Sequence, residues 1–209
     1  MRLVFVHGWA LGPEIWDALA SRLSEYAQAR VNLGYFGAAD IPTLQESDIL
    51  VGHSAGLLWG LREKRDWAGV VSINSFARFC LDAQGRGCVR PAALRAMRLS
   101  LERDPQDCAD AFRRSLGIAP ASGSAQKEHL MEGLDLLGGF DATSSLDRRP
   151  CLVLGAEDDF LAPPAAARDL AAQSGGALAL SATGGHGLPW TAPDFCAARI
   201  GEFLRAHEF

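Results

Sequence analysis

The stretch Asp48-Ile-Leu-Val-Gly-His-Ser-Ala-Gly-Leu-Leu58 decides the fold that we expect for this chain. Residues 49–51 are apolar, as in a buried strand, and residues 57–61 continue with the pattern of a helix. Between them lies Gly-x-Ser-x-Gly, in which Gly52 and Gly56 allow the strand and helix backbones to approach closely. Such a turn lifts the hydroxyl of Ser54 above the sheet and aims the positive end of the helix at any anion that forms there. Ser54 is therefore the candidate nucleophile.

Outward from this turn, short apolar segments alternate with helical patterns. Further strands are expected at residues 2–6, 29–33, 69–74, 150–155 and 177–180, and helices are expected to begin near residues 13, 163 and 193. Residues 41–45 form at most a short helix. This rhythm predicts the α/β class, with a mostly parallel sheet of about six strands and helices on both faces. Function in such sheets lies at the carboxyl ends of the strands, where Trp9, Gly34, Ser54 and Ser75 are expected.

Residues 77–137 interrupt the rhythm, because they contain helical patterns and no strand. Helices are expected from residue 91, over 107–116 and over 126–137. We interpret this segment as a short helical lid, inserted into a core that is formed by residues 1–76 and 138–209.

Length, charge and cysteine content limit the classes of function that we expect for the chain. A chain of 209 residues is long enough for one domain with a sizeable core, and its formal charge of −5 argues against a nucleic-acid or anionic-membrane binder. The opening residues lack the apolar stretch and cleavage site of a secretory signal, and no apolar run is long enough to span a membrane. The five cysteines have no repeated spacing, which predicts neither a disulfide framework nor a metal site. We expect a cytoplasmic protein without metal or cofactor.

A serine hydroxyl needs a base, and the base needs a carboxylate that fixes its tautomer. His186 lies between two glycines in the loop after the last strand, which makes it the candidate base. The acid is Asp158 or Asp159, which follow the preceding strand. We favour Asp159, because the pattern Asp-x-Leu-x-Pro fixes it against the start of the next helix. The order serine, acid, histidine belongs to one hydrolase architecture.

The other four histidines have simpler interpretations. His129 and His207 are expected on helix surfaces, and His53 is expected to be structural and to point away from Ser54. His7 is expected to shape the loop that begins at Gly8.

An oxyanion needs backbone N–H donors that are in place before the charge develops. In this architecture Ala55 supplies one donor and the loop after the first strand supplies the other, which is Trp9 here. Candidates for lining an apolar acyl pocket share large apolar side chains near these loops or on the lid, although core packing explains each of them better. They are Trp9, Leu57, Phe76, Met97, Leu101 and Trp190.

The Ser54 motif and the order serine, acid, histidine make the chain resemble the α/β-hydrolase superfamily over nearly its whole length. Three further stretches carry a resemblance to one family within it. They are His7-Gly-Trp-Ala-Leu-Gly-Pro-Glu-Ile-Trp16, Gly133-Leu-Asp-Leu-Leu137 and His186-Gly-Leu-Pro-Trp-Thr-Ala-Pro-Asp-Phe-Cys196. Within the superfamily the chain is most similar to the pimeloyl-ACP methyl ester esterases of biotin synthesis. It departs from them at the nucleophile, because relatives can carry Trp and Leu around the serine where this chain has His53 and Ala55.

The resemblance implies a serine carboxylesterase that acts on a small-molecule or carrier-bound acyl ester. Residues 78–114 contain eight arginines and five acidic residues, in a chain whose net charge is negative. This excess is either a solvated helix face or a docking surface for an acidic partner, and the resemblance implies an acyl carrier protein. The candidate docking residues are Arg90, Arg95, Arg98, Arg113 and Arg114.

Other activities fit the same three residues. The chain could be a generalist short-chain esterase, a thioesterase, a lactonase or a cofactor-free haloperoxidase. A haloalkane dehalogenase is disfavoured because its nucleophile is an aspartate. Outside enzymes, a ligand-binding module on a hydrolase fold is the alternative.

Overall fold

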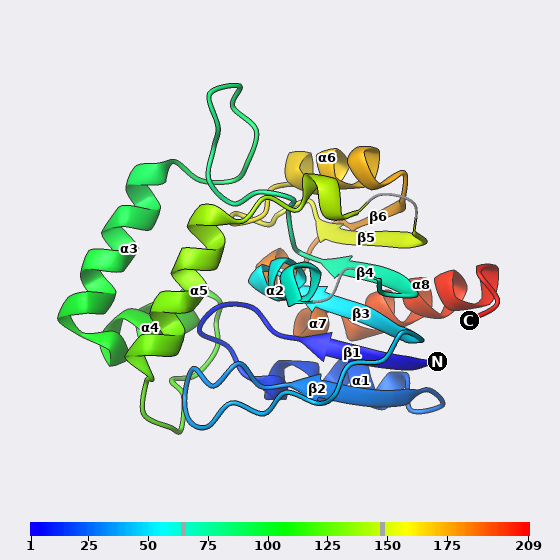
Figure 1. Ribbon diagram of the computed structural model, residues 1–209, viewed down its shortest axis with the longest axis horizontal. Coiled ribbons are helices and arrows are strands. Elements are labelled where there is room, and N and C mark those ends of the chain that lie inside the picture. The colour runs from blue at the N-terminus through cyan, green and yellow to red at the C-terminus, as the bar shows by residue number, and fades with distance from the viewer. Residues whose placement is uncertain (64–65, 147–148) are drawn as a thin grey trace.

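A computed structural model describes residues 1–63, 66–146 and 149–209. The described residues form a six-stranded parallel sheet in the order β2-β1-β3-β4-β5-β6 (Figure 1). The strands are β1 (Arg2–Val6), β2 (Ala27–Val31), β3 (Asp48–His53), β4 (Gly69–Ile73), β5 (Cys151–Ala156) and β6 (Ala177–Ser181). The expected α/β class with a parallel sheet is confirmed.

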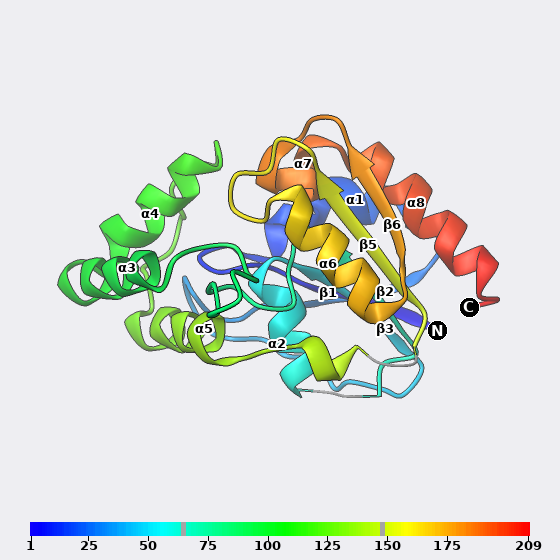
Figure 2. The same ribbon diagram turned by 90° about the horizontal axis from the view of Figure 1, so that it is seen from above.

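Helices cover both faces of this sheet. The α-helices of the core are α1 (Asp17–Arg22), α2 (Ala55–Glu63), α6 (Pro164–Ser174), α7 (Leu188–Thr191) and α8 (Pro193–Ala206). Three short 3₁₀ turns span Pro13–Trp16, Thr143–Ser145 and Gly185–Gly187. Figure 2 shows α1 and α8 on one side of the sheet and α2 on the other. Among the described residues, no helix is long and apolar enough to cross a membrane.

The four central strands, β1, β3, β4 and β5, are largely apolar on both sides because they are covered on both sides. Leu3 and Phe5 of β1 belong to the core cluster that includes residues of α1 and α8. Val4 and Val6 point the other way, into the cluster that includes residues of α2, α6 and the lid. This alternation follows from the two-residue period of a strand, and it explains why residues 3–6 of β1 are continuously hydrophobic.

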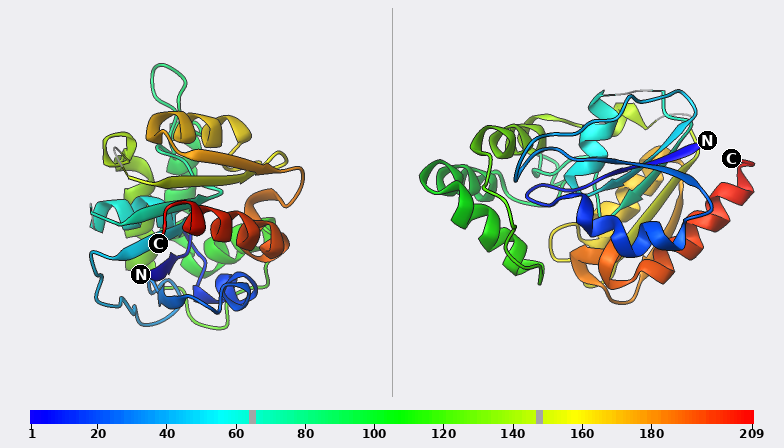
Figure 3. Two further views of the ribbon diagram at one scale, coloured as in Figure 1. Left: turned by 90° about the vertical axis from the view of Figure 1, so that its right-hand side faces the viewer. Right: turned by 90° about the horizontal axis from the view of Figure 1, so that it is seen from below.

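The lid helices are α3 (Pro91–Arg103), α4 (Pro105–Ser115) and α5 (Lys127–Gly139), which lie beyond the carboxyl ends of the strands (Figure 1; Figure 3, right). Helix α4 begins two residues earlier than residue 107, because the Asp104 side chain accepts a hydrogen bond from Asp107 N (3.0 Å) and caps the helix. Helix α5 ends at Gly139, two residues beyond the expected end of the lid.

One other expectation differs from the structure in detail. Strand β2 occupies residues 27–31 rather than 29–33. Residues 41–45 form no helix, which agrees with the expectation of at most a short one. Helix α7 follows the Gly185–Gly187 turn directly, in a segment to which the sequence analysis assigned no element.

The strand register brings the ends of β3, β4 and β5 to one level. His53 of β3 pairs with Ile73 of β4, and Ile73 pairs with Leu154 of β5. The residues that follow these strands therefore meet at one edge of the sheet.

Candidate active site

Ser54 lies at the tip of a sharp turn between β3 and α2, with a φ of 53° that non-glycine residues rarely adopt. A Cβ atom on Gly56 would lie 2.1 Å from the carbonyl oxygen of Val6, and one on Gly52 would lie 2.5 Å from Leu57 Cα. Both positions therefore require glycine. The turn is held by Ser54 N, which donates to Ile73 O (3.1 Å), and by the Ser75 hydroxyl, which donates to Ser54 O (2.7 Å).

The structure brings Ser54, His186 and Asp159 together in one line. His186 Nε2 lies 3.0 Å from Ser54 Oγ, and His186 Nδ1 lies 2.9 Å from Asp159 Oδ2 and 3.1 Å from Oδ1. An ionised carboxylate only accepts hydrogen bonds, so Nδ1 carries the proton and Nε2 is free to accept one from the serine. The side chains of His186 and Asp159 are almost fully buried, and Ser54 as a residue is 8% exposed. This geometry is that of a nucleophile, a base and an orienting acid.

Asp159, rather than Asp158, contacts the base. Its Oδ1 also accepts hydrogen bonds from the amides of Leu161 and Ala162 (2.9 Å each). Burial opposes ionisation of Asp159, but its hydrogen bond and attraction to His186 and these two amides outweigh burial and hold its pKa below the ordinary value. Asp158 is exposed, and its carboxylate accepts from Gly185 N (2.7 Å) and Gly184 N (3.3 Å). Asp158 therefore holds the loop that contains His186 and does not contact the imidazole.

Two further histidines are buried close to the triad. Leu33 N donates to His7 Nε2 (3.1 Å), so His7 Nδ1 is protonated and donates to Gly8 O (2.9 Å). The Nε2 of His53 donates to the carbonyl oxygen of His186 (2.9 Å), and the centroids of the two imidazole rings lie 5.0 Å apart. Burial lowers the pKa of His7 to about 4 and that of His53 to about 3, so both are neutral at pH 7.

The other two histidines differ in their surroundings. His129 is half-buried rather than on an open helix surface, and its Nδ1 lies 2.8 Å from Gly34 O. His207 lies just after α8, where its ring packs edge-on against Phe203 and at a tilt against Phe209.

The candidate oxyanion donors lie at the expected places in the chain. Ala55 is the first residue of α2, whose first four N–H groups have no partner within the helix. Trp9 lies in the loop after β1, and its indole Nε1 donates to Leu130 O of the lid (2.8 Å). The indole also packs edge-on against Phe112 of α4, with ring centroids 5.1 Å apart. The lid therefore fixes the Trp9 side chain, and its backbone N–H remains independent of where the ring points.

The candidate pocket residues are more deeply packed than a binding surface requires. Leu57 and Leu101 are completely buried in the core cluster on the lid side of the sheet, and Met97 is partly buried against it. Trp190 is half-buried with its ring 5.5 Å from that of His53.

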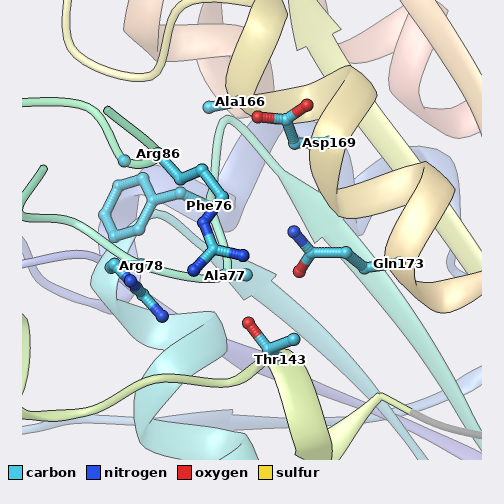
Figure 4. Close-up of a pocket in the computed structure, with 9 residues that line it drawn as sticks. Phe76, Ala77, Arg78, Arg86, Thr143, Ala166, Asp169 and Gln173 are labelled. Atoms are coloured by element: carbon cyan, nitrogen blue, oxygen red, sulfur yellow. The ribbon is translucent and has the colours of Figure 1, made fainter. Parts of the chain in front are cut away.

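Phe76, another candidate pocket residue, lines a small cavity between the lid segment and α6. Figure 4 shows the side chains of Arg86, Asp169 and Gln173 around it, and none of the three triad residues lines it. Its volume of about 20 Å³ admits about one water molecule and no acyl chain.

Of the candidate docking arginines, Arg113 differs from the others. Its side chain is 5% exposed and bonds Glu14 Oε1 (3.3 Å), Ala119 O (2.8 Å) and Ala10 O (3.3 Å). Arg90 and Arg95 are exposed, whereas Arg98 pairs with Asp135 and Arg114 with Asp107. The expectation that Arg113 faces a partner is therefore wrong, because α4 turns this position toward the core.

Among the described residues, no group of three His, Cys, Asp or Glu side chains is placed to hold a metal ion. The five cysteines are free thiols.

The parallel sheet and its serine turn define the α/β-hydrolase fold, and solved structures agree. A bromoperoxidase from Bacillus anthracis has a TM-score of 0.82 at 17% identity, covering 98% of this chain and 91% of that one. An esterase from Thermogutta terrifontis has a TM-score of 0.80 at 21% identity, covering 100% and 91%. No family model matches the sequence. The chain is also similar to the pimeloyl-[acyl-carrier protein] methyl ester esterase of Aromatoleum aromaticum, with 28% identity over 97% of this chain and 98% of the relative. The resemblance to α/β-hydrolases is confirmed.

Proposed function

We propose that the protein is a serine carboxylesterase. The observation that carries the proposal is the 3.0 Å distance between His186 Nε2 and Ser54 Oγ, with Asp159 behind the imidazole. A hydroxyl at this distance from a neutral imidazole nitrogen can transfer its proton as it attacks a carbonyl carbon.

The reaction proceeds through an acyl-enzyme. Ser54 Oγ attacks the ester carbonyl while His186 accepts its proton, and the N–H groups of Trp9 and Ala55 stabilise the oxyanion. His186 then protonates the leaving alkoxide as the carbon–oxygen bond breaks. A water molecule, deprotonated by His186, attacks the acyl group and releases the carboxylic acid and Ser54.

We further propose that the substrate is a methyl ester of pimeloyl-ACP. Support comes from the relative of that name, to which the chain is similar over 97% of its length. The exposed lid arginines Arg90 and Arg95 fit docking to an acidic carrier, whereas Arg98 and Arg114 are each paired with an aspartate of the lid.

Growth of a biotin-requiring strain that lacks its own methyl esterase tests the substrate. The wild-type gene is expected to restore growth and the Ser54→Ala variant is not. Purified protein should release methanol from pimeloyl-ACP methyl ester. Failure of both, with rapid cleavage of p-nitrophenyl butyrate, would identify a generalist esterase instead. Cleavage of that ester by Ser54→Ala at the wild-type rate would overturn the serine mechanism.

The carrier proposal has its own test. Arg90→Glu/Arg95→Glu is expected to raise KM for the carrier-bound ester and to leave KM for p-nitrophenyl butyrate unchanged. Arg199→Glu on α8 is the matched control, because Arg199 is an exposed arginine away from the lid. Equal KM values for the carrier-bound ester in all three proteins would exclude docking on these arginines.

A further inference from the structure

Asn74 is a buried polar residue that the sequence analysis did not assign. It directly follows β4, at the sheet edge where Ser54 and Asp159 also lie, and it is 1% exposed. Its φ is 48°, which is uncommon for any residue with a side chain although asparagine is enriched there. A strained conformation persists only where the surroundings require it, and such positions cluster at functional sites.

The amide of Asn74 bridges the acid and both sides of the base. Its Nδ2 donates to Asp159 Oδ2 (2.8 Å) and to Gly185 O (3.0 Å), and its Oδ1 accepts from Leu188 N (3.2 Å). Gly185 and Leu188 flank His186 in the chain. The orientation of the amide is unambiguous, because a flipped amide would set its oxygen against two acceptors and its nitrogen against a donor.

We propose that Asn74 is a positioning residue, which fixes the Asp159 carboxylate and the His186 backbone relative to each other. This inference rests on the proposed serine esterase function. The Asp159 oxygen that accepts from Asn74 is also the one closest to His186 Nδ1. Rotation of the carboxylate away from the imidazole therefore breaks the bond to Asn74 as well.

An uncharged amide suits this role better than an ionic partner. It donates to Asp159 without neutralising the negative charge that stabilises the imidazolium during the reaction. The other donors to Asp159, Leu161 N and Ala162 N, belong to the same loop as the acid. Asn74 is the bridge from β4 to both loops, so the triad geometry depends on the central sheet through this side chain.

Two variants separate this role from packing. Asn74→Gly accepts the positive φ and removes the amide, whereas Asn74→Asp keeps the shape and the acceptor for Leu188 N. In the aspartate variant, however, a carboxylate oxygen faces Asp159 Oδ2 and Gly185 O. If Asn74 only fills space, the isosteric aspartate variant should lose less activity than the glycine variant. If Asn74 positions the triad, the aspartate variant should lose more.

We expect kcat for p-nitrophenyl butyrate to fall about 10- to 100-fold in Asn74→Gly, with KM within about twofold, and to fall further in Asn74→Asp. The rate of Ser54 labelling by a fluorophosphonate should fall in the same order. Ser72→Ala is the matched control, because this buried β4 hydroxyl has no hydrogen-bond partner among the described residues. It should keep the wild-type kcat.

The outcomes distinguish this inference from the proposed function. If wild-type protein is neither labelled nor active, the esterase proposal fails first. If wild-type protein is active and Asn74→Gly has the wild-type kcat and labelling rate, the role of Asn74 is refuted alone. It is also refuted if a folded Asn74→Asp variant, judged by near-ultraviolet circular dichroism, is more active than Asn74→Gly.

Discussion

At the scale of single residues, neighbouring side chains of the same type have separate tasks. Asp158 and Asp159 are consecutive carboxylates, yet Asp159 faces the imidazole while Asp158 accepts from the amides of Gly184 and Gly185. Spacing alone cannot separate them, because the loop that contains them is irregular and successive side chains have no fixed direction. The bonds from Leu161 N and Ala162 N, just before α6, are what turn Asp159 inward.

This division predicts different losses for two otherwise similar substitutions. Asp159→Asn is expected to lower kcat/KM by about 10³–10⁴-fold, because an amide no longer stabilises the imidazolium or fixes its tautomer. Asp158→Asn loses exposed hydrogen bonds to the loop and should lower kcat/KM by less than about tenfold. Initial rates with p-nitrophenyl butyrate measure kcat/KM for both variants. Equal losses in the two variants would mean that the carboxylate contacts are wrongly assigned.

At the scale of elements, the sequence was most informative where hydrophobic periodicity is strong. The buried strand β3 and the turn at Ser54 follow from apolar residues and two glycines, and both glycines are required by close backbone contacts. Strand β2 lies at the edge of the sheet and is largely half-exposed, so its pattern is weak and its expected position was displaced by two residues.

The candidate site, like the fold, could be predicted from the sequence only in part. Ser54 and His186 could be found because glycines mark their turns. The role of Asn74 could not, because it depends on hydrogen bonds to residues 85 and 111 positions away. One signal was present: a polar residue immediately follows an apolar strand at the carboxyl edge of the sheet. Arg113 was misplaced for a related reason, since charge counting does not reveal which face of α4 contacts the core.

The lid is attached to the core through side chains and backbone near β1 and β2. Arg113 bonds Glu14 and Ala10 O, and Trp9 bonds Leu130 O. Gln126 N, just before α5, donates to Tyr35 O (2.8 Å). The bonds of Trp9 and Ala10 attach the loop after β1 to the lid helices.

Adjacent arginines of α4 test this attachment. Arg113→Met leaves Ala119 O and Ala10 O without their donor, so we expect the free energy of unfolding to fall by about 1–3 kcal/mol. Arg114→Met removes an exposed pair with Asp107 and should change it by less than about 0.5 kcal/mol. Urea denaturation measures both values. An equal effect of the two substitutions would show that the buried contacts of Arg113 contribute no stability.

At the scale of the whole molecule, two buried neutral histidines, His7 and His53, hold the loops around the candidate site. His7 supports the loop after β1, and His53 supports the backbone of His186. Both rings are completely shielded from solvent, which is why the charged form is unfavourable in the folded protein. The same burial that fixes the loops of Gly8 and His186 therefore makes folding sensitive to acid.

The direction of this sensitivity follows from proton uptake. The pKa of His7 is about 4 and that of His53 about 3 in the folded protein, against an ordinary value of 6.5 for each. Below pH 6.5 the unfolded chain binds protons that the folded chain excludes, so the free energy of unfolding falls with pH until about pH 4 and 3. Each histidine contributes about 1.4 kcal/mol per pH unit, so the two together should reduce it by about 4 kcal/mol between pH 7 and pH 5. Asp159 adds a loss of the same sign only at lower pH, because its folded pKa is depressed and its contribution disappears as the carboxylate is protonated.

Urea denaturation at pH 7, 6 and 5 measures how steeply the free energy of unfolding falls with pH. The variant His53→Gln keeps a donor for His186 O but has no ring to protonate, so it should halve this dependence on pH. Constant stability over this range would show that the two rings are not held neutral.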